Sequence, residues 1–298
     1  YNPQEMAVQP LHIIFAGTPA FAVPSLKALA GNPSFTIDLV ITQPDKPVGR
    51  KGVITPPPVK VAAEKLGILV WQPADINKEP MPDLPNSPTP DYLVVVAYGQ
   101  LLKEPLLALP KIAPVNVHAS LLPRWRGASP IQHAILAGDA ETGVAVQRMV
   151  KALDEGPILA QEKIMIGARE TFTELHDRLS LMGAKLLVDT LLSKYKSKPQ
   201  SNDGVTLCKK LTRASGAIDP SSMTAIEIDR RVRALNPWPG VTMESSLKIL
   251  ESTLQSAPGT IPLSCKDDTT VYLVTVQPAG GKPMTGEEWK RGHFPNTQ

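Results

Sequence analysis

The first two thirds of the chain alternate short apolar runs with segments of helical pattern. Residues 11–16, 37–41 and 92–97 read as strands, and the last of these runs is almost continuously apolar, as in a strand covered on both faces. Helical patterns occupy 59–66 and 131–137. This alternation predicts an α/β domain with a doubly wound, mostly parallel, Rossmann-like sheet.

The first strand leads into Gly17-Thr18-Pro19. Thr18 is expected to cap the following helix, with Pro19 at the first helical position. Gly17 stands alone here, whereas the dinucleotide-binding fingerprint needs three spaced glycines. A nicotinamide cofactor is therefore not expected.

The pattern changes after residue 195. Between 194 and 213 the chain carries one acidic side chain and six basic ones, Lys194, Lys196, Lys198, Lys209, Lys210 and Arg213. Such a run is usually a solvated linker, and it is also what a phosphate-contacting surface needs. A helical segment and short strand-like runs follow, as in a small β-barrel-like domain. We therefore expect a catalytic domain at 8–195, a basic linker at 196–210 and a β-rich domain at 211–298.

Composition excludes several classes of protein. The chain is 42% apolar and 20% charged, as in a globular protein, and its net charge of +3 gives no global argument for nucleic acid. Cys208 and Cys265 fit neither a zinc site nor a disulfide framework, so no metal is expected and a reducing, cytoplasmic location is. No apolar run approaches the roughly 18 residues of a membrane-spanning helix, and no membrane partner is expected.

Three polar side chains stand at alternate positions near the end of one apolar strand. They are Asn116, His118 and Ser120. Alternate residues of a strand point to the same face, so the three groups are expected to lie together. An amide donor beside an imidazole can stabilise an oxyanion and move a proton. This strand end is the predicted catalytic site.

An imidazole that works near neutral pH commonly has a carboxylate partner. Asp154 follows the strand-like run 142–150 and precedes Gly156-Pro157. A carboxylate in such a turn is most often only a turn former. The functional interpretation is favoured by His118, because both residues are expected at strand ends of one sheet.

Together these residues identify a resemblance. Asn116 to Pro123, with Asp154 and Gly156 downstream, resembles the folate-dependent formyltransferases. Residues 15–19, 43–52, 123–132, 236–240 and 276–282 are similar to the branch of that family that acts on methionyl-tRNA. The resemblance covers about residues 11–292. Members of the family often have Asp-Thr-Gly where this chain has Asp154-Glu155-Gly156.

The resemblance implies transfer of a formyl group from 10-formyltetrahydrofolate to the α-amine of initiator methionyl-tRNA, by a monomer. It implies catalytic roles for Asn116, His118 and Asp154. The folate is expected at two stretches, comprising Tyr98, Gly99, Gln100, Leu101, Ser120, Leu121, Leu122 and Pro123. The tRNA is expected at basic side chains of loop 43–60 and of the linker, namely Lys46, Arg50, Lys51, Lys209 and Lys210.

Other functions remain open at the level of sequence. A nucleotide-sugar formyltransferase, or a formyltetrahydrofolate hydrolase domain, would use the same three catalytic residues. A tRNA-binding protein that has lost catalysis would keep the fold and the basic loop. The Arg50-Lys51 loop favours tRNA over a sugar nucleotide, and the complete set of Asn116, His118 and Asp154 favours an enzyme.

Overall fold

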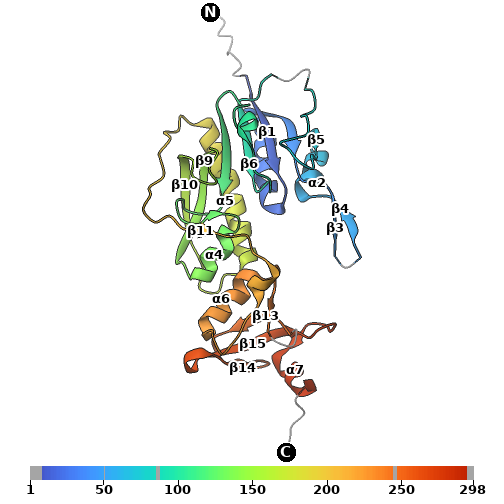
Figure 1. Cartoon of the computed structure of the whole chain (residues 1–298), viewed down its shortest axis with the longest axis vertical. Helices are drawn as coiled ribbons and strands as arrows, with labels where there is room; N and C mark the ends of the chain where they lie inside the picture. The colour runs from blue at the N-terminus through green and yellow to red at the C-terminus, as the bar shows by residue number, and fades with distance from the viewer. Residues whose placement is uncertain (1–8, 50, 85–87, 244–246, 294–298) are drawn as a thin grey trace, which may run out of the picture. The chain divides into compact units, whose positions relative to one another are not determined.

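The computed structural model describes residues 9–49, 51–84, 88–243 and 247–293. The chain divides into two compact units (Figure 1). The first unit comprises residues 1–126, 143–163 and 177–206, and the second comprises 127–142, 164–176 and 207–298.

A seven-stranded sheet forms the framework of the first unit. Its strand order is β10-β9-β7-β6-β1-β2-β5. The strands are β1 (Leu11–Gly17), β2 (Phe35–Ile41), β5 (Val70–Trp71), β6 (Tyr92–Val96), β7 (Ala113–His118), β9 (Glu141–Arg148) and β10 (Ile158–Met165). From β5 to β7 all neighbours are parallel, and β9 is antiparallel to β7. The mostly parallel sheet predicted from the apolar runs is confirmed.

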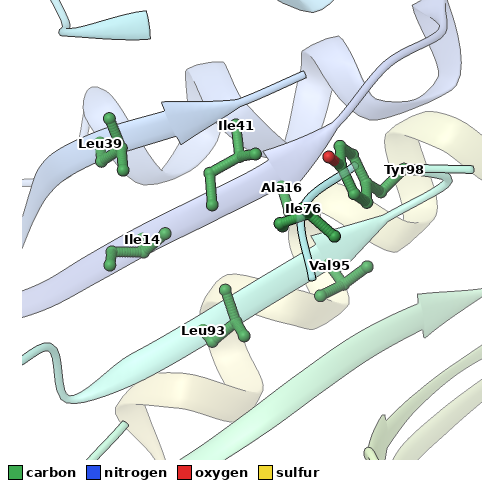
Figure 2. Packing of buried hydrophobic residues seen from close by; sticks show 8 residues of the cluster. All are labelled: Ile14, Ala16, Leu39, Ile41, Ile76, Leu93, Val95 and Tyr98. Atoms are coloured by element: carbon green, nitrogen blue, oxygen red, sulfur yellow. The ribbon is translucent and has the colours of Figure 1, made fainter. Parts of the chain in front are cut away.

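The apolar strands form the core of this sheet. β6 is buried along its whole length, as its continuous apolar run predicted. A cluster of side chains from β1, β2 and β6 packs together with Ile76 and Tyr98 (Figure 2). The helices of the first unit include α1 (Val23–Ala30), α2 (Pro58–Lys65), α3 (Glu104–Leu107) and most of α5 (Phe172–Leu192). Thr171 and Glu174 form a capping box at the start of α5, a pattern that the sequence Thr171-Phe172-Thr173-Glu174 predicts, with Glu174 Oε2 2.8 Å from both the backbone nitrogen and the hydroxyl of Thr171.

The strand order reverses between β1 and β6, and ligands of such sheets bind beside this point, at the carboxyl ends of the strands. Thr18, directly after β1, does not cap a helix as expected. Its hydroxyl donates to the Tyr98 carbonyl at 2.7 Å and accepts from the Gln43 amide at 3.4 Å. α1 begins only at Val23. The prediction was wrong because the hydroxyl connects the segments that follow three neighbouring strands, a long-range demand absent from the local sequence.

A five-stranded antiparallel sheet forms the main part of the second unit, in agreement with the β-rich domain that was expected. Its strands are β12 (Val241–Thr242), β13 (Lys248–Thr253), β14 (Ile261–Ser264), β15 (Thr270–Gln277) and β16 (Met284–Thr285). The helices α4 (Pro130–Ala137), α6 (Ala225–Leu235) and α7 (Gly286–His293) belong to the same unit. Among the described residues, β12 and β14 each pair with a single strand, so this sheet is open.

Across the part of the chain that the structure describes, no helix has the length and apolar character needed to cross a membrane.

Candidate active site

Asn116 and His118 lie at the carboxyl end of β7 and share one face of the strand, as their spacing predicted. β7 is fixed on both sides, by β6 in parallel and by β9 in antiparallel pairing. The His118 side chain is buried, and Asn116 is half-buried. The strand therefore presents an amide and an imidazole at the sheet edge where ligands bind in this architecture.

Asp154 occupies a turn between β9 and β10 and has a positive φ of 54°. Gly156 lets this turn approach the end of β9, because a Cβ atom at Gly156 would lie 1.7 Å from the Arg148 carbonyl oxygen. The amide of Arg148 also donates to the Pro157 carbonyl at 2.9 Å. The Asp154 side chain is only 9% exposed as a result. The positive φ of Asp154 and the close approach at Gly156 thus place the carboxylate against the sheet.

Three side chains converge on one oxygen of this carboxylate. Asp154 Oδ1 accepts from Gln147 Nε2 at 2.8 Å, and it lies 3.5 Å from Asn116 Nδ2 and 3.6 Å from His118 Nδ1. Gln147 is the register partner of Asn116 on β9. The structure therefore brings together the three residues that the sequence assigned to catalysis.

The imidazole of His118 has a defined orientation. Nε2 lies 2.8 Å from the backbone carbonyl oxygen of Trp125. A carbonyl oxygen can only accept a hydrogen bond, so Nε2 carries a proton and Nδ1 faces Asp154. The separation of 3.6 Å exceeds a normal N–H···O hydrogen bond. A proton can thus be gained or lost at Nδ1 while Trp125 holds the other side of the ring.

The residues predicted to bind folate differ in their exposure to solvent. Tyr98 and Leu122 are buried, and Ser120 is fully buried with its hydroxyl donating to the Arg124 carbonyl at 2.6 Å. Gln100 anchors a neighbouring loop, since its Oε1 accepts from the Ile76 amide at 2.9 Å. Exposed or half-buried positions are Gly99, Leu101, Leu121 and Pro123. Direct contact between these residues and a folate stays a prediction.

The buried hydroxyl of Tyr98 has no hydrogen-bond partner within the described residues. Figure 2 shows the ring in the cluster with Ala16 and Ile76. Burial, together with the negative charges of Glu79 and Asp75, raises the pKa of Tyr98 to about 12. The phenol is therefore neutral near pH 7 and can donate a hydrogen bond to a ligand.

The basic side chains of the loop after β2 differ in their surroundings. Lys46 and Lys51 are exposed at the hairpin formed by β3 (Lys46–Val48) and β4 (Val53–Thr55). Lys60 instead pairs with Asp45 at 2.8 Å. Hydrogen bonds from Gln72 and then Lys60 hold the pKa of Asp45 below its usual value. Arg50 lies outside the described residues, and Lys209 and Lys210 are exposed.

Sequence reasoning missed three residues that surround the cluster. Gln147 ends an apolar run, and a polar residue at a strand end could have drawn attention to it. Gln200 and Thr206 lie in the segment interpreted as a basic linker, and no local signal distinguishes them. Gln200 nevertheless donates to the Asp154 carbonyl, and Thr206 accepts from the Trp125 amide, each at 2.8 Å.

Comparison with known families gives two matches. Residues 11–191 match the formyl transferase family, and residues 210–293 match the formyl transferase C-terminal domain. A methionyl-tRNA formyltransferase of Halorhodospira halophila is 42% identical over 299 residues, covering 94% of this chain and 96% of the relative. The methionyl-tRNA formyltransferase of Methylococcus capsulatus is 40% identical, with 95% and 97% covered.

Solved structures share the fold at low sequence identity. An N-formyltransferase from Helicobacter canadensis, in complex with folinic acid and dTDP-3-aminofucose, has a TM-score of 0.67 at 18% identity. The alignment covers 88% of this chain and 98% of that one. HypX from Aquifex aeolicus, in complex with tetrahydrofolic acid, has a TM-score of 0.60 at 11% identity, covering 94% of this chain and 46% of that one.

Proposed function

The chain belongs to the formyl transferase family, and on that premise we propose that it transfers the formyl group of 10-formyltetrahydrofolate to the α-amine of initiator methionyl-tRNA. The product is N-formylmethionyl-tRNA. The convergence of Asn116 and His118 on Asp154 at the end of β7 is the observation that carries the proposal. The two methionyl-tRNA formyltransferases that match nearly the whole chain support the choice of acceptor.

In this reaction the amine nitrogen attacks the formyl carbon, and the bond from that carbon to the folate nitrogen breaks. One proton leaves the amine and one is gained by the folate nitrogen. Negative charge develops on the formyl oxygen as the amine attacks. A site that stabilises this charge and relays the proton lowers the barrier.

Asn116 is suited to stabilise the oxyanion. Its amide nitrogen is 3.5 Å from Asp154 Oδ1, at the outer limit of a hydrogen bond. Donation to a substrate oxygen would therefore break only a weak contact within the protein. Removal of a single oxyanion donor typically raises the activation barrier by about 2.7–4 kcal/mol. His118 is held through Nε2, which leaves Nδ1 as the nitrogen that exchanges a proton.

Asp154 completes the proton path. Its Oδ1 lies 3.6 Å from His118 Nδ1 and 3.5 Å from Asn116 Nδ2, so a proton taken from the amine would pass between groups that lie close together. Gln147, at 2.8 Å from Oδ1, keeps the carboxylate oriented while its other contacts change.

The folate supplies the activated formyl group. Residues 97–102 follow β6 at the switch point of the sheet and would hold it. Ala97 and Gly99 have positive φ values of 48° and 96°, so the backbone bends sharply there. The unpartnered hydroxyl of Tyr98 is a donor that fits a polar ligand.

The tRNA would be bound by exposed basic side chains. Lys46 and Lys51 on the β3–β4 hairpin would contact tRNA phosphates.

An acceptor assay tests the proposal. Purified protein is supplied with 10-formyltetrahydrofolate and either charged initiator tRNA or amino-sugar nucleotides, and kcat/KM is measured for each. We expect efficient formylation of methionyl-tRNA and no formylation of the amino-sugar nucleotides. Formylation of the sugar nucleotides alone would instead assign the chain to that substrate class. Absence of transfer to either acceptor, with tRNA binding intact, would favour the tRNA-binding alternative.

A further inference from the structure

The segment that follows α5 runs along the candidate active site. We name residues 198–206 the return segment. At its start, Lys198 and Ile158 exchange two backbone hydrogen bonds of 2.8 Å, which attach the segment to the first residue of β10. At its end, the Thr206 carbonyl accepts from the Arg126 amide at 2.9 Å. All of these residues lie within the first unit.

Gln200 binds the turn that carries Asp154. Its Nε2 donates to the backbone carbonyls of Asp154 at 2.8 Å and Gly156 at 2.7 Å. Its Oε1 accepts from Arg126 Nε at 3.0 Å. Arg126 Nη1 also lies 3.4 Å from the carboxylate of Glu155, the middle residue of the turn. One side chain therefore holds the turn on both sides of Glu155.

Thr206 supports His118 through the loop after β7. Its hydroxyl accepts from the Trp125 amide at 2.8 Å, and the Trp125 carbonyl accepts from His118 Nε2 at 2.8 Å. Trp125 has a φ of 61°, in a region that bulky side chains seldom occupy. Such a conformation persists only where its surroundings fix it, and Thr206 supplies one of those contacts.

We infer that the return segment is a positioning device for catalysis, in which Gln200 fixes Asp154 and Thr206 fixes His118. The inference rests on the function proposed above. The two positioning residues touch no reacting atom, and each acts through one catalytic residue. Because displacement of a catalytic group by 1 Å can cost about a hundredfold in rate, contacts of this kind affect turnover strongly.

This role differs from the one expected for a basic linker. Phosphate contacts made by lysines affect tRNA affinity and its salt dependence. Gln200 and Thr206 are neutral. Their side-chain hydrogen bonds include those to Asp154, Gly156 and Trp125, and those of Gln200 also reach Arg126 and Gln147. Their loss should therefore lower kcat and leave tRNA binding unchanged.

Two substitutions separate the contacts. Gln200→Glu keeps an acceptor for Arg126 and removes both N–H donors to the Asp154 turn. Thr206→Val keeps the shape of the side chain and removes the hydroxyl that accepts from Trp125, whereas Thr206→Ser retains it. Asn202→Ala, at an exposed position of the same segment, is the matched control.

For each full-length variant, kcat and KM for methionyl-tRNA are measured, together with the stoichiometry of folinic acid binding, which counts folded sites. We expect kcat per folded site to fall roughly 10- to 100-fold in Gln200→Glu and Thr206→Val, as for loss of orienting groups around other catalytic centres. KM for methionyl-tRNA should stay within about twofold, and Thr206→Ser and Asn202→Ala should resemble the unmodified protein.

Unchanged kcat per folded site in Gln200→Glu and Thr206→Val would overturn the inference, and so would a raised KM with unchanged kcat. If one variant does not fold, the other decides, since the two act on different catalytic residues. Failure of the unmodified protein to formylate methionyl-tRNA would contradict the proposed function itself, which is a distinct result.

Discussion

Two carboxylates with little solvent exposure, Asp154 and Asp229, have different surroundings. In the second unit, Asp229 accepts from Arg169 at 2.6 Å, from Arg233 at 3.0 Å and from Ser252 at 2.9 Å, so both of its oxygens are engaged at close range. In the first unit, Asp154 Oδ1 accepts from the Gln147 amide at 2.8 Å, and it lies 3.5 Å from the Asn116 amide nitrogen and 3.6 Å from His118 Nδ1.

If Asp154 is catalytic as proposed, this difference separates a structural carboxylate from a reactive one. Arg169 and Ser252 connect Asp229 on α6 to other parts of the second unit, and Arg233, on α6 itself, engages the second oxygen of the carboxylate. In the proposed reaction, the longer separations of 3.5 and 3.6 Å at Asp154 Oδ1 would let the Asn116 amide and the His118 imidazole exchange partners. Burial alone therefore does not identify a catalytic carboxylate, and the lengths and types of its contacts must be considered as well.

The largest effect is expected from His118→Ala and from Asp154→Asn. Each should lower kcat by about 10²- to 10⁴-fold, because general acid–base groups contribute that much. The melting temperature should change little, because His118 Nδ1 and Asp154 Oδ1 are 3.6 Å apart, farther than in a normal hydrogen bond. Asp189→Asn, at an exposed surface pair with Lys185, controls for the exchange of carboxylate for amide. Near-normal turnover of either folded variant would remove the catalytic assignment.

Asp229→Ala should show the reverse pattern. It leaves Arg169 and Arg233 without their carboxylate, and loss of one partner of a buried pair costs about 3–5 kcal/mol of unfolding free energy. Urea denaturation measures this loss. Turnover per folded molecule should be unchanged at a temperature where the variant is folded. A fall in kcat without loss of stability would break the distinction between the two carboxylates.

Basic side chains of loop 43–60 can likewise be divided into those expected to bind tRNA and one, Lys60, that is held in an ion pair within the fold. Replacing Arg50 and Lys51 by alanine should raise KM for methionyl-tRNA several-fold and reduce the salt dependence of binding, by about 0.7–0.9 in the log–log slope for each phosphate that the variant no longer neutralises. Lys60→Met is the matched control, because Lys60 is already paired with Asp45. An equal loss of folate affinity in the double variant would place the loop at the folate pocket instead.

The smallest effect is expected at Tyr98. Tyr98→Phe removes a hydroxyl that has no partner within the described residues, so the unfolding free energy should change by less than about 1 kcal/mol. Folate affinity should fall roughly 2- to 12-fold, the value of one neutral hydrogen bond. Because the pKa of Tyr98 is raised to about 12, the phenol stays protonated and this ratio should be constant from pH 7 to 9. Unchanged affinity in calorimetry would show that the hydroxyl does not contact the folate.

The elements that follow from local patterns were predictable from the sequence. The apolar run of β6, the capping box of α5 and the turn at Asp154 are each specified by a few neighbouring residues. The proximity of Asn116, His118 and Asp154 was also predictable, because alternate strand positions and strand ends impose it.

The remaining features depend on contacts between distant parts of the chain. Thr18 has the local sequence of a helix cap, but its hydroxyl binds Tyr98, 80 residues away. Gln200 lies in a segment that the sequence indicated only as a basic linker, and its partner Arg126 is 74 residues away in the sequence. Periodicity cannot report such contacts, since it records only which face of an element is apolar.

A double-mutant cycle on kcat tests most directly whether His118 and Asp154 act as one proton-handling unit. The rates of His118→Ala, Asp154→Asn and the combined variant are measured with saturating 10-formyltetrahydrofolate and methionyl-tRNA. We predict that the combined variant is about as slow as the slower single variant, because either change already disables the unit. Losses that multiply would show that the two residues contribute independently, which would contradict the account.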